Sequence, residues 1–183
     1  MTKSICVFCG ARMGNNSDFG QAALDLGYVI AKNEWRLVYG AGDVGLMGAV
    51  AEGTQVSGAA TFGVIPEHLM LREVGKRDLD KIVITDDMHS RKKLMFTNSD
   101  AVVLLPGGVG SMEEFFEVLT WRQLGLHEKP IYLLDIDGYW APLSTLMTHI
   151  VAEGFAGQSL VDFIQSIETV ALLETHLKAY LNV

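Results

Sequence analysis

Short apolar runs alternate with longer segments of helical periodicity along the whole chain. The apolar runs predict strands at Ser4–Phe8, Arg36–Tyr39, Ala60–Ile65, Lys81–Thr85, Ala101–Leu105, Ile131–Leu134 and Leu160–Ile164. The periodicity predicts helices at Asp18–Lys32, Leu46–Ser57, Asp87–Asn98, from the acidic pair Glu113 and Glu114 to Leu124, at Pro142–Glu153 and at Glu168–Leu181. Strands that alternate with helices of this length are typical of a parallel sheet. We therefore expect an α/β fold, a Rossmann-like doubly wound parallel sheet with helices on both faces.

The bulk composition narrows the class of protein. The chain has 183 residues, 49% of them hydrophobic and 20% charged, and we expect a single domain over residues 1–183. Its net charge of −8 argues against nucleic-acid or anionic-membrane partners. No apolar run reaches the roughly 18 residues of a membrane span, and the apolar run at the N-terminus is too short for a signal peptide. We expect a cytoplasmic protein.

The cysteines and histidines do not indicate a redox or metal centre. Cys6 and Cys9 form a C-x-x-C spacing, but they lie in a predicted strand and at its end, whereas a redox dithiol usually opens a helix. We interpret them as buried thiols in a reducing compartment. The five histidines are scattered and His-Glu-x-x-His is absent, so we expect no metal site.

A glycine-rich turn, Pro106–Ser111, follows the strand at Ala101–Leu105 and precedes the acidic helix. A strand, a glycine turn and a helix start in this order leave backbone N–H groups pointing at an anion. Because Glu113 and Glu114 follow closely, we interpret the stretch as a phosphate site beside a catalytic acid. The alternative is that the glycines merely allow a tight turn and close packing.

A second glycine turn, Gly40–Gly45, has the G-x-G-x-x-G spacing of a dinucleotide site. Glu67, about 20 residues further on, would suit the ribose-binding acid of an NAD enzyme. That spacing normally follows the first strand, however, and here it follows the second. Parallel strands bind ligands at their carboxyl edge, where both glycine turns lie. We therefore favour one phosphate held from both sides and keep an NAD-dependent enzyme as an alternative.

Cationic and acidic side chains supply the candidate chemistry. Arg91 and Lys92 follow Met88 by three and four residues and precede Met95, which places all four on one predicted helix face. The two cations either snorkel at the edge of an apolar stripe or face a ligand, and their place near the phosphate edge favours a ligand.

The two adjacent acids also have two interpretations. Glu113 and Glu114 near a helix start would complement the helix dipole, which keeps them ionised. An ionised carboxylate suits stabilisation of an oxocarbenium-like sugar or activation of water. Because Glu117, one turn on, can pair with Glu113 on the outer face, Glu114 is the preferred inward acid.

Three motifs together resemble the signature of the Lonely Guy family. They are YGAGDVGLMG at Tyr39–Gly48, MHSRK around Arg91 and PGGVGSMEE at Pro106–Glu114, and the similarity extends through WRQLGLHEKP and DGYWAPL. The resemblance implies a hydrolase without metal or cofactor that cleaves the N-glycosidic bond of N6-modified adenosine 5′-monophosphates, with AMP as an open alternative. The products would be free base and ribose 5-phosphate. Short members of the family are usually homodimers whose active sites take residues from both chains, so the resemblance implies a homodimer with active sites at its interface.

The resemblance also implies site residues. Arg91 and Glu114 match the catalytic pair. The substrate-binding positions it implies are Gly42, Gly45, Met47, Gly48, Glu73, Lys92, Gly107, Gly108, Val109, Gly110, Ser111, Met112, Glu113 and Thr120. The chain departs from the family at Ala41, where a glycine is common, at Ser111, which replaces threonine but keeps the hydroxyl, and at Ala11, where a serine is common.

Two further readings remain beside the hydrolase and the NAD-dependent enzyme. The same pocket in a nucleotide-binding module would hold its ligand without turnover. Similar sequences have also been labelled lysine decarboxylases, but that chemistry normally needs a Schiff-base lysine for pyridoxal phosphate on a larger scaffold. Nothing in this sequence indicates such a lysine.

Overall fold

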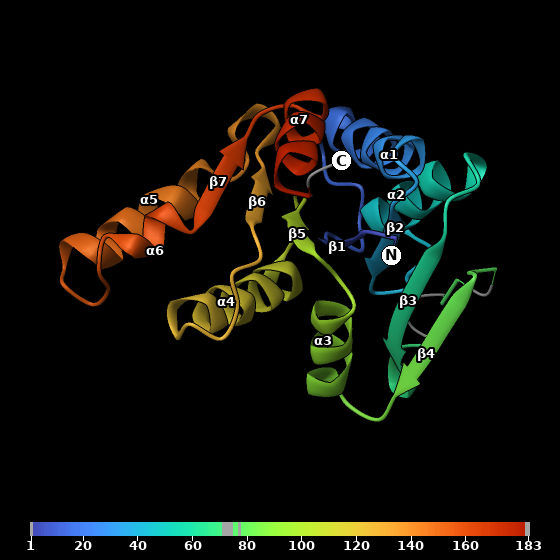
Figure 1. Ribbon diagram of the computed structural model, residues 1–183, viewed down its shortest axis with the longest axis horizontal. Helices are drawn as coiled ribbons and strands as arrows, with labels where there is room; N and C mark the ends of the chain where they lie inside the picture. Colours follow the sequence, from blue (N-terminus) through green and yellow to red (C-terminus); the bar gives the residue numbers. More distant parts are fainter. Residues whose placement is uncertain (1, 71–74, 77, 182–183) are drawn as a thin grey trace.

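The computed structural model describes residues 2–70, 75, 76 and 78–181, and within them one parallel sheet organises the chain (Figure 1). The strand order is β4-β3-β2-β1-β5-β6-β7. The strands are β1 (Ser4–Phe8), β2 (Arg36–Tyr39), β3 (Thr61–Pro66), β4 (Lys81–Thr85), β5 (Ala101–Leu104), β6 (Ile131–Leu134) and β7 (Ile164–Ile167). The helices are α1 (Ser17–Lys32), α2 (Gly45–Val56), α3 (Met88–Thr97), α4 (Val109–Gln123), α5 (Ala141–Ala152), α6 (Ser159–Asp162) and α7 (Val170–Leu181), with 3₁₀ turns η1 (Glu67–Leu69) and η2 (Ile136–Gly138).

This architecture confirms the predicted α/β fold, and two element assignments were wrong. The last strand is Ile164–Ile167, not Leu160–Ile164, because Ile164 pairs with Ile131 of β6 while Leu160 belongs to α6 and packs into the core. The acidic helix α4 begins at Val109 rather than at Glu113, because Val109, Gly110 and Ser111 already form its first turn. Glu113 and Glu114 are therefore beyond the first turn.

Alternating side chains of the sheet build a core on each face. Along β1, Ile5 and Val7 pack with α1, α2 and α7, whereas Cys6 and Phe8 pack with α3, α4 and α5. Cys6 and Cys9 are both buried and neither forms a disulfide, and they belong to the cores on opposite faces of the sheet. The burial of both side chains confirms the interpretation of two buried thiols.

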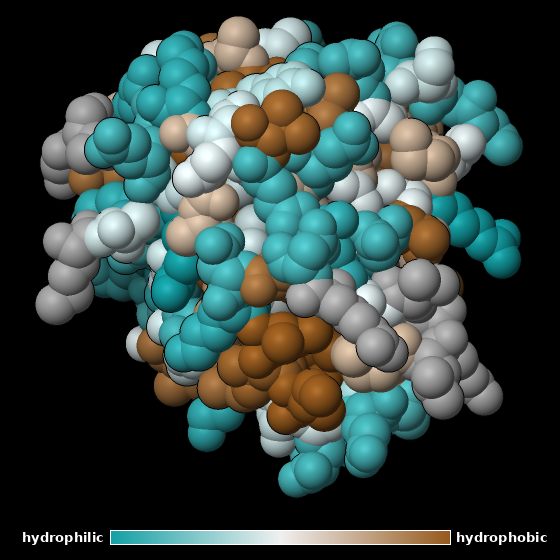
Figure 2. Space-filling model, turned by 90° about the vertical axis from the view of Figure 1, so that its right-hand side faces the viewer, coloured by the Kyte–Doolittle hydropathy of each residue, from teal (hydrophilic) through white to brown (hydrophobic). Residues whose placement is uncertain are grey.

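The edge of the sheet at β4 is partly apolar. Ile84 on β4 is 56% exposed, and Figure 2, which faces this side of the molecule, shows an apolar patch among polar residues. No helix in the described part of the chain is long and apolar enough to cross a membrane.

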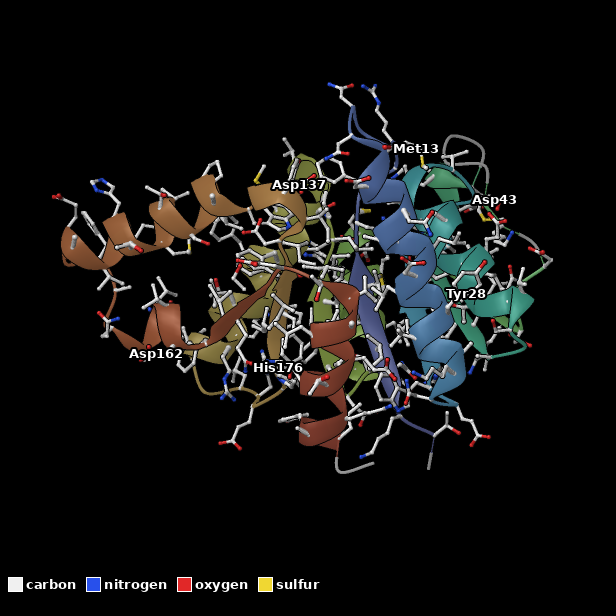
Figure 3. The ribbon with its side chains drawn as sticks, turned by 90° about the horizontal axis from the view of Figure 1, so that it is seen from above. Met13, Tyr28, Asp43, Asp137, Asp162 and His176 are labelled. Carbon is white, nitrogen blue, oxygen red and sulfur yellow. The ribbon has the colours of Figure 1, made fainter. Side chains whose placement is uncertain are left out.

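Helices α1 and α2 pack backbone to backbone (Figure 3). A Cβ atom added to Gly27 would lie 2.4 Å from the carbonyl oxygen of Val50, and one added to Gly53 would lie 2.2 Å from that of Leu24. Both neighbours are backbone atoms that cannot rotate away. The two glycines therefore set the distance between the helices, and through it the position at which α2 begins.

We expect Gly53→Ala to lower the free energy of unfolding by about 1–3 kcal/mol, because the new methyl group overpacks the contact with Leu24. Glu52→Ala, at the adjacent exposed position, is the matched control and should change stability by less than about 0.5 kcal/mol. Urea unfolding midpoints of the three proteins measure both effects. Equal midpoints for Gly53→Ala and wild type would show that the helices separate without cost.

Candidate active site

A cavity of about 520 Å³ opens at the carboxyl edge of the sheet. Strand β1 has β2 on one side and β5 on the other, so the strand order reverses there, which is where ligands bind in open parallel sheets. The loops after β1, β2 and β5 line the cavity together with parts of α1, α3, α4 and the turn after η2.

The loop after β1 joins the two glycine turns. The N–H of Gly10 donates to the carbonyl of Pro106 at 3.0 Å, and the N–H of Leu46 donates to the carbonyl of Gly10 at 3.1 Å. Gly45 has a φ of 61°, and a Cβ there would lie 2.3 Å from the carbonyl carbon of Ala11. One short segment thus holds the starts of both α2 and α4.

The second glycine turn places the N-terminus of α4 at the cavity. The first backbone bond of the helix runs from the N–H of Met112 to the carbonyl of Gly108 at 3.1 Å. The amides of Val109, Gly110 and Ser111 precede it and have no acceptor within the helix. Because Gly108, Gly110 and Ser111 line the cavity, this helix terminus suits an anion such as a phosphate.

Arg91 on α3 lies in the cavity wall and is only 5% exposed. Its Nε donates to the carbonyl of Val64 at 3.1 Å, and its Nη2 donates to that of Gly40 at 2.9 Å. A Cβ on Gly40 would lie 2.1 Å from Nη2. The first glycine of the G-x-G-x-x-G turn therefore makes room for a guanidinium whose position is fixed and whose charge is permanent.

Glu114 on α4 lines the same cavity and is 8% exposed. Burial raises the pKa of the Cys6 thiol well above its ordinary value, and the negative charge of Glu114 raises that pKa further. As the sixth residue of α4, Glu114 lies too far along the helix for dipole complementation to explain its position. The structure therefore brings Arg91 and Glu114, the predicted catalytic pair, to one cavity.

Lys92 turns away from the cavity and links α3 to α4. It is 3% exposed, forms a short ion pair with Glu113, and lies 3.0 Å from a carboxylate oxygen of Glu117. Burial lowers the pKa of Lys92, but the hydrogen bonds to the two carboxylates outweigh it and raise that pKa above the ordinary value. The expectation that Arg91 and Lys92 share one face was wrong, because consecutive helical residues point about 100° apart.

The other predicted binding residues divide into two groups. Those that line the cavity are Met47, Gly107, Gly108, Gly110 and Ser111. Those that do not line it are Gly42, Gly45, Gly48, Lys92, Val109, Met112, Glu113 and Thr120. Glu73 lies outside the described residues.

The first glycine turn serves the fold more than the cavity. Gly42 forms an antiparallel bridge with Gly75, and the N–H of Gly48 donates to the carbonyl of Val44 at 3.2 Å. Gly45 and Gly48 line a second, polar groove instead. The turn at Pro106–Ser111 therefore contributes more residues to the cavity, while the first turn contributes Gly40, whose carbonyl accepts from Arg91. The phosphate held from both sides stays a prediction.

The residues of α4 outside the cavity have separate environments. Val109 is 78% exposed, Met112 packs against the core, and the exposed Thr120 donates its hydroxyl to the carbonyl of Phe116. Of the departures from the family, Ala11 lines the cavity, while buried Ala41 adopts a φ of 59° that favours glycine.

Several cavity residues were missed by the sequence analysis. They are Arg12 and Met13 after β1, Phe19 on α1, Leu69 on η1 and Tyr139 after η2. The sequence could have indicated them only by their position, because the segments after β1, β3 and β6 also lie at the carboxyl edge of the parallel sheet, where ligands bind. Glycines and charged residues alone do not reveal them in the sequence.

Comparisons with known proteins give the family. A family model described as "Possible lysine decarboxylase" matches residues 47–177. The chain is 44% identical over 176 residues to "Probable cytokinin riboside 5′-monophosphate phosphoribohydrolase LOGL1" of Oryza sativa subsp. japonica, covering 96% of this chain and 79% of the relative. It is 47% identical over 154 residues to "Cytokinin riboside 5′-monophosphate phosphoribohydrolase" of Rhodococcoides fascians, covering 84% and 78%.

Solved structures agree on the fold. The molybdenum cofactor carrier protein of Chlamydomonas reinhardtii aligns over 100% of both chains with a TM-score of 0.75 and 21% identity. The molybdenum cofactor binding protein of Rippkaea orientalis gives 0.75 and 20%, covering 99% of this chain and 98% of the other. The sequence relatives and the family model go further than the fold: this chain belongs to the Lonely Guy family, the cytokinin riboside 5′-monophosphate phosphoribohydrolases within the possible lysine decarboxylase model.

Proposed function

We propose that this protein, as one domain over residues 1–183, hydrolyses the N-glycosidic bond of N6-modified adenosine 5′-monophosphates. The products are the free base and ribose 5-phosphate, and AMP is an open second substrate. The observation that carries the proposal is the meeting of Arg91, Glu114 and the N-terminus of α4 in one cavity. The names of the sequence relatives support the same substrate class.

The phosphate supplies binding energy away from the bond that breaks. The amides at the start of α4 and the Ser111 hydroxyl would bind the 5′-phosphate, which orients the ribose. Gly107, Gly108 and Gly110 keep this turn free of side chains. Met47, Met88 and Met95 add apolar surface for the base. Binding energy from the remote phosphate can thus serve the reaction at the sugar.

The catalytic step is a displacement by water at C1′. As the bond from C1′ to the purine nitrogen breaks, its electron pair leaves with the base, which takes up a proton from solvent to become the free base, and positive charge develops on the sugar. The Glu114 carboxylate would stabilise that charge and accept a proton from the attacking water. Arg91 would stabilise the departing purine or hold Glu114 in place.

Lys92, Glu113 and Glu117 have a supporting role in this proposal. By tying α3 to α4, the cluster holds Arg91 and Glu114 on facing helices. Within one chain, Lys92 and Glu113 then affect the substrate indirectly, because they hold Arg91 and Glu114 in place.

We also propose that the protein acts as a cytoplasmic homodimer with active sites at the interface. The exposed positions Val109 and Thr120 on α4, and the apolar patch at the β3–β4 side of the molecule (Figure 2), support an interface. Two buried cysteines that form no disulfide suit a reducing compartment.

Glu114→Gln should lower the rate of base release by at least about 100-fold, because the amide can neither accept the proton of water nor stabilise the sugar cation. Nucleotide affinity should stay within about threefold, since the phosphate contacts remain. Chromatographic detection of base from isopentenyl-AMP measures the rate, and calorimetry measures the affinity. Glu128→Gln, at an exposed position outside the cavity, is the control. Retained hydrolysis in Glu114→Gln would remove this residue from the mechanism.

The same assay separates the alternatives. A wild-type protein that binds nucleotide but releases base from neither AMP nor isopentenyl-AMP would be a binding module. Binding of a nicotinamide cofactor with hydride transfer would instead favour the NAD-dependent enzyme.

Gly40→Ala should lower kcat by roughly tenfold or more, because the new Cβ takes the place of Arg91 Nη2 and moves the guanidinium. Gly157→Ala is the matched control, because a Cβ there meets nothing closer than 3.8 Å. Steady-state kinetics on isopentenyl-AMP and a urea midpoint are measured for both. Unchanged kcat in a folded Gly40→Ala protein would mean that the position of Arg91 is not critical.

Sedimentation velocity tests the homodimer. We expect a single species at twice the 20.0 kDa mass of the chain, and Val109→Arg should shift it toward that of the monomer. A wild-type monomer at micromolar concentration that is fully active would contradict a shared active site.

A further inference from the structure

Tyr139 lies on a turn that the chain holds in a strained shape. Asp137 and Gly138 have φ values of 52° and 71°, and the left-handed conformation is costly for a residue with a Cβ. Side-chain contacts hold the turn in place. The side-chain amide of Asn16 donates to a carboxylate oxygen of Asp137 at 2.6 Å, and the backbone N–H of Trp140 donates to a carboxylate oxygen of Asp135 at 2.6 Å. Figure 3 shows Asp137 beside the N-terminal end of α1.

The Tyr139 side chain connects this turn to the cavity. Its hydroxyl donates to the carbonyl of Gly107 at 2.5 Å, although the two residues lie 32 positions apart. Its ring packs edge-on against Phe19 of α1, with centroids 5.2 Å apart, and against Trp140 at 4.8 Å. Tyr139, Phe19 and Gly107 all line the cavity.

The hydrogen bond from Tyr139 fixes one peptide of the Pro106–Ser111 turn. The described peptide bonds are all trans, so the C=O of Gly107 and the N–H of Gly108 point in opposite directions. Holding the first therefore sets the direction of the second. The preceding peptide is held in the same way, because the carbonyl of Pro106 accepts from Gly10. Two successive peptides of a glycine turn are thus restrained from different parts of the fold.

We propose that Tyr139 is a positioning residue that preorganises the Pro106–Ser111 turn for the substrate phosphate. The inference rests on the proposed function for the identity of the ligand. Glycines lose more conformational freedom on ordering than other residues, so an unrestrained turn binds phosphate more weakly. Tyr139 acts through Gly107 and Gly108, and it serves phosphate binding in particular because the restrained peptide leads directly into the N-terminus of α4.

Tyr139→Phe tests this role because it removes the hydroxyl and keeps the ring against Phe19. Loss of one neutral hydrogen bond should raise the Kd for ribose 5-phosphate by about 3- to 10-fold. The Kd for adenine, which lacks phosphate, should stay within about twofold. Tyr180→Phe is the matched control, because the Tyr180 hydroxyl also bonds a backbone carbonyl, that of Glu128, outside the cavity. Titration calorimetry measures both ligands with each protein.

The outcomes separate this inference from the proposed function. A Tyr139→Phe protein with wild-type affinity for ribose 5-phosphate, or with equal losses for ribose 5-phosphate and adenine, overturns the positioning role. Wild-type protein that fails to bind ribose 5-phosphate overturns it as well. If the wild-type protein releases base while any of these results is found, the proposed hydrolase activity is supported and only the positioning role is overturned. If Tyr139→Phe weakens ribose 5-phosphate binding but the wild-type protein releases no base, the positioning role is supported and the hydrolase activity is overturned.

Discussion

The two hydrogen bonds of the Gly10 backbone are the constraint on which the site depends. Gly10 donates to Pro106 in one glycine turn and accepts from Leu46 at the end of the other. Because β1 lies where the strand order reverses, its loop has both turns as neighbours. The starts of α2 and α4 are therefore fixed relative to each other by backbone atoms, which no side-chain motion can relax. A Cβ on Gly10 would lie 3.2–3.4 Å from Arg12, Gly107 and Pro106, so the loop has little room to move.

A second constraint positions the proposed catalytic pair within this frame. Lys92 is buried between Glu113 and Glu117, and its removal from water costs much of what the ion pairs return. Such a cluster contributes to position more than to stability, because it determines how α3 and α4 meet. The neighbouring residues Arg91 and Glu114 then face the cavity from two helices. The charged residues thus separate into an inner pair in the cavity, for which we propose the catalytic role, and an outer cluster that joins the two helices.

The limits of the sequence analysis follow from the same geometry. Local periodicity was enough for β2 and β4, whose predicted bounds match the observed strands, and for choosing Glu114 over Glu113 as the inward acid. It failed at Leu160, because an apolar residue in a short helical turn looks like one in a strand. It also missed Phe19 and Tyr139, which meet only after distant segments fold together. The G-x-G-x-x-G spacing was present, yet Gly40 serves to seat Arg91, a relation that no local pattern contains.

The cavity combines fixed polar groups with adaptable apolar ones. Arg91 is held by two backbone carbonyls, and the turn before α4 is held by Gly10 and Tyr139. The apolar lining includes methionines, whose flexible side chains fill irregular space and tolerate different partners: Met13, Met47, Met88 and Met95. Rigid groups suit the part of a nucleotide that never varies, the phosphate and ribose. Flexible ones suit a base whose N6 substituent differs between substrates, so the division of side chains matches a family of related nucleotides better than a single one.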